Sequence, residues 1–142
     1  MTLDGDTGCI TLPEIGAVIS SSLSRSQFLQ TPAFGAASVS VCNEPWCSYR
    51  LPTIPQADTD LYIVVQFRGE RLLSLSLAHD AARFGSSWAD WSEERELALK
   101  AFHERWITHD LRAHLGGYSW GYISSQYDAK GGSSSINISY AD

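Results

Sequence analysis

The chain has 142 residues, of which 44% are hydrophobic and 18% charged, and its formal net charge is −6. These values predict one folded domain spanning residues 1–142 and exclude a disordered chain. The negative charge disfavours nucleic acid and anionic membranes as partners, because both attract basic surfaces, and it is compatible with a basic protein partner.

The N-terminal residues and the cysteines indicate the compartment. Residues 1–6 are acidic and lack the basic start and the apolar stretch of a signal peptide. Three cysteines, Cys9, Cys42 and Cys47, leave at least one thiol unpaired within the chain. We expect free thiols in a reducing cytoplasm. Cys42 and Cys47 have four residues between them and no supporting histidine, so we expect no zinc site, no other metal and no cofactor.

The first half of the chain contains short elements and one long loop. Residues 8–12 predict a short strand, and the capping-box pattern at residues 24–27 predicts a short helix that Pro32 ends. Polar and apolar residues alternate over residues 38–42, which predicts a half-buried strand. Three prolines make residues 43–60 mostly loop.

Two hairpins carry the firmest β signal. Apolar residues alternate along residues 61–67 and 71–78, and the short connection between them contains a glycine, so residues 61–78 predict a hairpin. A second hairpin is predicted at residues 118–140, with strands at 118–127 and 133–140.

A long helix is predicted between the hairpins, over about residues 91–115. Asp90 and Glu93 form a capping pair at its start, and two glycines at 116–117 supply its end. Its inner face is expected to consist of Leu97, Ala98, Ala101 and Phe102, with Trp106 at the border. Its outer stripe is expected to consist of Glu96, Lys100 and Glu104. The whole pattern predicts an α+β fold with an antiparallel sheet built from hairpins and the long helix packed on one face.

Two catalytic motifs are present in part and fail on their context. Residues 117–121 match the G-x-S-x-G pattern of a hydrolase nucleophile elbow around Ser119, but a strand follows where a helix is required, and every histidine precedes the serine. His103 and Glu104 begin the metalloprotease pattern H-E-x-x-H, but Ile107 occupies the position of the second histidine. We therefore predict no catalytic residues, although the question of an enzyme stays open.

The segment 84–94 combines aromatic and acidic residues where a loop enters the long helix. One interpretation is structural, with a tryptophan packed at the helix entrance and the acids capping it. The other is a docking surface, since exposed aromatic residues anchor protein interfaces and acids steer a basic partner. The candidate partner-binding residues are Trp46, Tyr49, Trp88, Asp90, Trp91, Glu93 and Glu94. Whether Trp88 and Trp91 are core or exposed is left open.

The sequence favours a non-catalytic protein-binding domain, specifically an immunity-type antidote, a small cytoplasmic bacterial protein that occludes a basic toxin domain. The alternative is a small-molecule-binding domain or minor enzyme that uses Arg105 and His109 in a cleft between helix and sheet. A third possibility is self-association through an exposed sheet edge at residues 133–140. The oligomeric state and the identity of the partner are not determined by the sequence.

Overall fold

The computed structural model describes residues 1–85 and 87–141, which form two antiparallel sheets and one long helix. The N-terminal sheet has the order β1–β2–β3, with bounds Thr2–Leu3, Ile10–Leu12 and Ala17–Ile19. The large sheet has the order β4–β5–β7–β8–β11–β10–β9, and β6 pairs with β7 at its side. Its strands are β4 (Ser38–Asn43), β5 (Trp46–Arg50), β6 (Ile54–Pro55), β7 (Asp60–Arg68), β8 (Arg71–Asp80), β9 (Gly116–Tyr118), β10 (Gly121–Asp128) and β11 (Ser133–Tyr140). The expected α+β class is confirmed.

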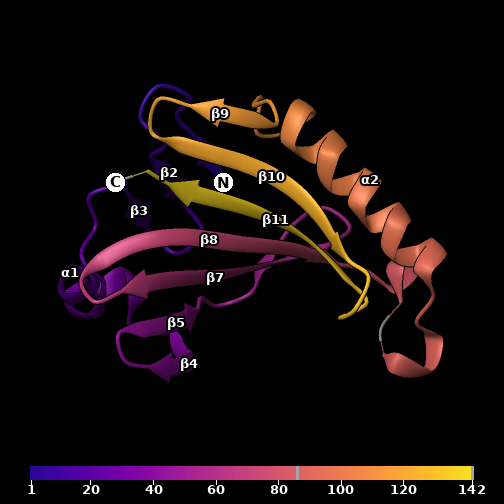
Figure 1. Cartoon of the computed structure of the whole chain (residues 1–142), viewed down its shortest axis with the longest axis horizontal. Helices are drawn as coiled ribbons and strands as arrows, with labels where there is room; N and C mark the ends of the chain where they lie inside the picture. Colours follow the sequence, from indigo (N-terminus) through magenta and orange to yellow (C-terminus); the bar gives the residue numbers. More distant parts are fainter. Residues whose placement is uncertain (86, 142) are drawn as a thin grey trace.

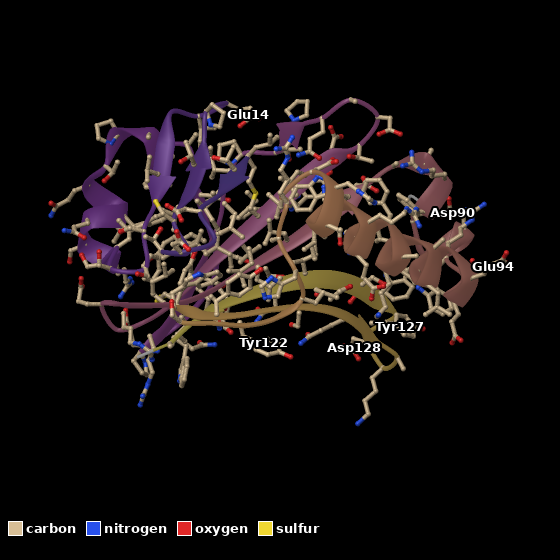
Figure 2. All side chains as sticks on the ribbon, turned by 90° about the horizontal axis from the view of Figure 1, so that it is seen from above. Glu14, Asp90, Glu94, Tyr122, Tyr127 and Asp128 are labelled. Atoms are coloured by element: carbon tan, nitrogen blue, oxygen red, sulfur yellow. A yellow bond between two sulfur atoms is a disulfide. The ribbon has the colours of Figure 1, made fainter. Side chains whose placement is uncertain are left out.

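The helical elements connect and cover these strands (Figure 1). They are α1 (Arg25–Gln30), α2 (Glu93–His109) and three short 3-10 helices, η1 (Pro32–Phe34), η2 (Ala82–Phe84) and η3 (Trp88–Asp90). The long helix α2 and the N-terminal sheet lie on the same face of the large sheet (Figure 2). Apolar side chains from this face, from the N-terminal sheet and from α2 form one continuous core.

The central hairpin is confirmed as β7 and β8. Alternate residues of β7 are buried, from Leu61 to Phe67, and they pair across to buried residues of β8. This period of two places one set of side chains in the core and the other on the outer face of the sheet. Gly69 lies in the turn with a φ of 57°, a left-handed conformation that favours glycine.

The C-terminal hairpin is confirmed as β10 and β11, but its expected first boundary is wrong. Tyr118 ends a separate strand, β9, which folds back to pair with β10. Ser119 and Trp120 form the turn between these strands. The strand β11 is paired on both sides, with β8 and with β10, so the suggested exposed edge at residues 133–140 is also wrong.

The long helix is shorter than expected at both ends. It begins at Glu93, where the Ser92 side chain accepts a hydrogen bond from the Arg95 amide, so Ser92 and not Asp90 is the N-cap. It ends at His109, before the glycines that were expected to end it. Arg112 adopts a left-handed φ of 53°, which turns the chain away from the helix axis without a glycine.

The inner face of α2 differs from the expected one. The buried residues of the helix are Leu99, His103, Trp106 and Ile107. Leu97 and Ala98, expected inside, are exposed, and Phe102 is only partly buried. The expected outer residue Glu96 is half-buried and bonded to β11. The prediction fails because the helix buries a histidine, which a pattern of apolar residues assigns to the surface.

The first half of the chain follows the prediction in part. Ser24 and Gln27 form the expected capping box at the start of α1. The strand β4 exists, but all its residues are exposed, so the expectation of a half-buried strand is wrong. The loop expected at residues 43–60 contains β5 and β6.

The prediction of three free thiols is wrong for two of them. Cys42 and Cys47 lie directly opposite each other in β4 and β5 and form a disulfide, while Cys9 is free. The antiparallel register places the two residues side by side, which the expected loop does not. The argument for a reducing compartment therefore loses its basis.

No helix among residues 1–85 and 87–141 is long and apolar enough to cross a membrane.

Candidate functional site

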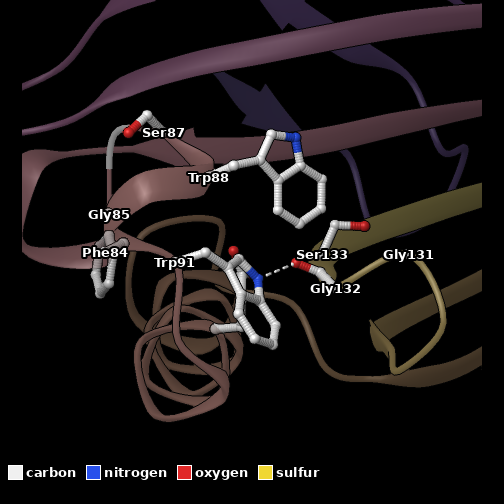
Figure 3. A pocket seen from close by; sticks show the side chains of 9 residues that line it. Phe84, Gly85, Ser87, Trp88, Trp91, Gly131, Gly132 and Ser133 are labelled. Carbon is white, nitrogen blue, oxygen red and sulfur yellow. Dashed lines mark hydrogen bonds between the residues drawn. The ribbon is translucent and has the colours of Figure 1, made fainter.

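A cleft of about 390 Å³ opens between the loop that leads into α2 and the loop that joins β10 to β11 (Figure 3). We call it the tryptophan cleft. Its lining residues are Phe84, Gly85, Ser87, Trp88, Trp91, Glu96, Gly131, Gly132 and Ser133. It thus includes both tryptophans of the segment that the sequence singled out.

Short-range hydrogen bonds hold the first side of the cleft. In η3 the Ser87 side chain accepts from the Ala89 amide, and the Asp90 carboxylate accepts from the Ser87 amide at 2.8 Å. Gly85, with a φ of 91°, turns the chain just before η3, and a side chain there would be strained. These contacts fix the backbone from which Trp88 and Trp91 project.

The two tryptophans have different environments. The Nε1–H group of Trp91 donates a hydrogen bond to the Gly132 carbonyl at 2.7 Å, and the indole lies against the Cα of Gly132 (Figure 3). Trp91 remains 39% exposed, whereas Trp88 is 79% exposed. The ring centroids lie 6.4 Å apart, with 39° between the ring planes. Trp91 therefore joins the two loops, and Trp88 is the free wall of the cleft.

Glu96 contributes a carboxylate to the cleft and ties α2 to β11. Its Oε2 atom accepts a hydrogen bond from the Ser134 amide at 3.0 Å, and its backbone carbonyl accepts from the Ser134 hydroxyl at 2.6 Å. Within residues 1–85 and 87–141, Glu96 Oε1 has no hydrogen-bond partner. This cleft-lining residue thus has one carboxylate oxygen without a partner among the described residues.

The segments that carry the cleft are acidic, and Figure 2 shows Asp90, Glu94 and Asp128 at the same end of the molecule. Residues 87–96 and 127–133 carry five carboxylates against two cations. The carboxylates belong to Asp90, Glu93, Glu94, Glu96 and Asp128, and the cations to Arg95 and Lys130. Desolvation, and after it the Glu93 carboxylate, raise the pKa of the Tyr127 phenol above its usual range.

Predicted site residues at this end fall into three groups. Glu93 and Glu94 are exposed in the first turn of α2, as a docking surface requires. Asp90 is committed to the loop itself, because its carboxylate also forms an ion pair with Arg95 at 3.4 Å. Trp88 and Trp91 line the cleft together.

The other two predicted anchors lie in β5, at the opposite end of the molecule from the start of α2 (Figure 1). Trp46 is 47% exposed, and the Arg68 guanidinium lies 5.1 Å from its ring centroid. Tyr49 is only 4% exposed and packs against Phe28 and Phe67, so the expectation of an exposed anchor is wrong. The structure does not bring these residues together with Trp88.

Arg105 and His109, the alternative ligand-binding residues, line a second, smaller cleft of about 180 Å³. Its other lining residues are Phe102, Trp106 and Asp110. All five belong to α2 and its C-terminal cap, so this cleft is a groove along the helix and not a space between helix and sheet.

A buried histidine pair is absent from the sequence-based prediction. His79 and His103 are 2% and 0% exposed, and the His79 amide donates to Nε2 of His103 at 3.1 Å. Burial lowers the pKa of His79 to about 3 and that of His103 to about 4. Both imidazoles are therefore neutral near pH 7 and closed off from solvent, which suits packing better than proton transfer to a substrate. The two histidines are 24 residues apart and meet only in the folded structure. The sequence around each of them therefore does not indicate the contact.

The remaining motifs do not form a catalytic arrangement. Ser119 lies in a turn between two strands, whereas a nucleophile elbow leads from a strand into a helix. Cys42, Glu44 and Cys47 have metal-ligating atoms within 4.8 Å of one another, but the two sulfurs form a disulfide and Glu44 pairs with Arg25 at 2.9 Å. We assign no metal to this group.

Comparisons with known proteins do not place the chain in a family: no protein-family model, no curated protein and no solved structure matches it.

Proposed function

We propose that the protein is a non-catalytic binding protein that recognises a basic protein partner through the tryptophan cleft and the acidic residues beside it. The observation that carries this proposal is the exposure of Trp88, at 79%, on a loop held by hydrogen bonds. Tryptophan side chains are enriched at the binding hot spots of protein interfaces. Glu93 and Glu94 supply complementary charge to a basic partner.

The partner class that fits this surface best is a toxin domain with a basic active site, and the protein would then be its antidote. Acidic residues around an aromatic anchor accelerate association with a basic surface, and rapid capture is what protection from a toxin requires. This assignment rests on charge, size and the anchor residues together.

The test is a comparison of captured proteins from the source cell. The immobilised wild-type chain is compared with the charge-reversed variant Glu93→Lys/Glu94→Lys. A matched control, Asp6→Lys/Glu14→Lys, makes the same change in net charge on exposed residues elsewhere. We expect a basic protein that binds the wild type and the control and is lost with the first variant. Equal capture by all three chains would refute the proposed surface.

The groove along α2 supports a second candidate function, the binding of a small ligand. It combines the Arg105 guanidinium and the His109 imidazole with the rings of Phe102 and Trp106, which suits a small aromatic carboxylate. Saturation-transfer NMR with benzoate tests this candidate. A signal that Arg105→Ala removes supports it, and no signal at millimolar benzoate refutes it.

A further inference from the structure

We infer that the tryptophan cleft binds a single arginine side chain of the protein partner. This inference rests on the proposed function and names the group that the cleft recognises. Three features of the cleft support it: the spacing of its rings, the free oxygen of its carboxylate and the absence of an obstructing side chain on one wall.

The rings of Trp88 and Trp91 offer π faces to a flat cation. Their centroids are 6.4 Å apart and their planes are inclined by 39°, so they form an open wedge and not a closed stack. A guanidinium group is planar, stacks on aromatic faces and loses less hydration energy than an ammonium group. Trp91 is held in place by its hydrogen bond to the Gly132 carbonyl, which means that one wall is already ordered before a ligand binds.

Glu96 supplies the charge that selects a cation. It is half-buried, and its Oε2 atom is fixed by the Ser134 amide while Oε1 faces no partner among the described residues. A carboxylate fixed in this way forms charge-assisted hydrogen bonds with a guanidinium group without first having to be ordered.

The third wall of the cleft has no side chains at Gly131 and Gly132. A Cβ atom at Gly132 would lie 3.0 Å from Nε1 of Trp91, and one at Gly131 would lie 2.6 Å from the Asp128 carboxylate. The two glycines therefore let the loop approach the tryptophan closely and add no side chain to this wall of the cleft.

The test uses the indole N–H signals in NMR spectra of the full chain, which contains five tryptophans. The probe is the peptide acetyl-Gly-Arg-Gly-amide, and the comparison peptide carries citrulline, which keeps the shape of arginine without its charge. We expect the arginine peptide to shift the Trp88 and Trp91 signals and the citrulline peptide to leave them unchanged. Equal shifts with both peptides, or shifts confined to other tryptophans, would overturn the inference.

Two variants separate the local contact from general electrostatics. Glu96→Gln keeps an oxygen for the Ser134 amide and removes the charge, and we expect it to weaken peptide binding about tenfold. Asp6→Asn removes the same charge from an exposed residue that does not line the cleft, and we expect less than about a threefold change because salt screens an exposed charge. Equal losses in the two variants would overturn the role of Glu96.

Tetramethylammonium distinguishes a protein side chain from a free small cation as the ligand. Tighter binding of tetramethylammonium than of the arginine peptide would overturn the inference in favour of a small-molecule site.

The outcome of the peptide experiments is independent of the lysate comparison. Loss of partner capture on charge reversal, together with no binding of the arginine peptide, would support the docking surface and refute the arginine pocket. Binding of the peptide, together with no captured protein that is lost on charge reversal of Glu93 and Glu94, would refute the proposed function.

Discussion

The imidazole of His103 in α2 accepts a hydrogen bond from the backbone amide of His79 in β8, with 3.1 Å between the two nitrogen atoms. The pairing of β8 with β11 covers only residues 74–77 of β8. The amide of His79 therefore lies beyond the end of the β8–β11 ladder and needs another hydrogen-bond acceptor. The bond requires Nε2 of His103 to be unprotonated. The contact between helix and sheet thus depends on neutral histidine.

The histidine pair predicts a loss of stability in mild acid. The pKa of both imidazoles is lower in the folded chain, about 3 for His79 and about 4 for His103, than the ordinary histidine value of 6.5. The unfolded chain therefore binds more protons below pH 6.5, so stability is complete above this pH and is lost as the pH falls toward 4. The slope approaches about 1.4 kcal/mol per pH unit for each histidine.

Urea unfolding at pH values of about 7.5, 6 and 5 measures this slope. His103→Gln should reduce it, and His109→Gln, which changes an exposed histidine of the same helix, should leave it unchanged. The charge of Glu104 acts on His103 in the opposite sense and limits the effect. Identical slopes in wild type and His103→Gln would show that the buried pair does not control the acid response.

Substitution of the two cleft tryptophans should separate binding from stability. Trp88→Ala removes a side chain that is 79% exposed, so we expect the free energy of unfolding to change by less than about 0.5 kcal/mol. Trp91→Ala removes the hydrogen bond to Gly132 and its packing, and should cost about 1–2 kcal/mol. Chemical denaturation of both variants gives these values. A large destabilisation by Trp88→Ala would mean that this residue serves the fold.

Substitution of Gly132 by alanine should destabilise the protein more than the same substitution at Gly69, a glycine of similar conformation. Gly132 has a φ of 65°, and a Cβ atom there would lie 3.0 Å from the Trp91 indole, whereas Gly69 has a φ of 57° and open space within 4 Å of the same position. Both alanine variants bear the cost of a left-handed residue, about 1 kcal/mol. Gly132→Ala should cost about 1 kcal/mol more because of the contact with Trp91. Equal unfolding midpoints for the two variants would contradict the close approach.

The disulfide between Cys42 and Cys47 should be present and of modest importance for stability. It closes a loop with a sequence separation of only 5 residues, for which the loss of unfolded-state entropy corresponds to about 2 kcal/mol. Thiol titration of the unreduced, denatured protein should detect one thiol per chain, that of Cys9. Detection of all the cysteines as thiols in protein purified without reductant would contradict the pairing.

Local patterns predict the elements whose structure is decided locally. The period of two in β7 and β8 and the capping box at Ser24 and Gln27 are satisfied by neighbouring residues, so the sequence is sufficient for them. The end of α2 is not predicted because Arg112 adopts a conformation that is usually associated with glycine. The disulfide is not predicted because its cysteines lie next to a proline-rich segment that resembles a loop.

The sequence predicts which types of residue gather at the candidate site, but not how these residues are arranged in space. The clustering of tryptophan and acid in residues 84–94 is visible in the sequence. Which tryptophan is exposed depends on the distant loop between β10 and β11, because Gly132 accepts the bond from Trp91 and leaves Trp88 free. The burial of Tyr49 depends in the same way on its contacts with Phe28 and Phe67.

Stopped-flow measurement of the rate of association with the captured partner, across a range of salt concentrations, is the decisive experiment for the acidic docking surface. We predict a fast rate that falls steeply as salt rises, and a slower rate with a flatter salt dependence for Glu93→Lys/Glu94→Lys. A rate that is indifferent to salt and equal in the two proteins would refute recognition of a basic partner through this surface.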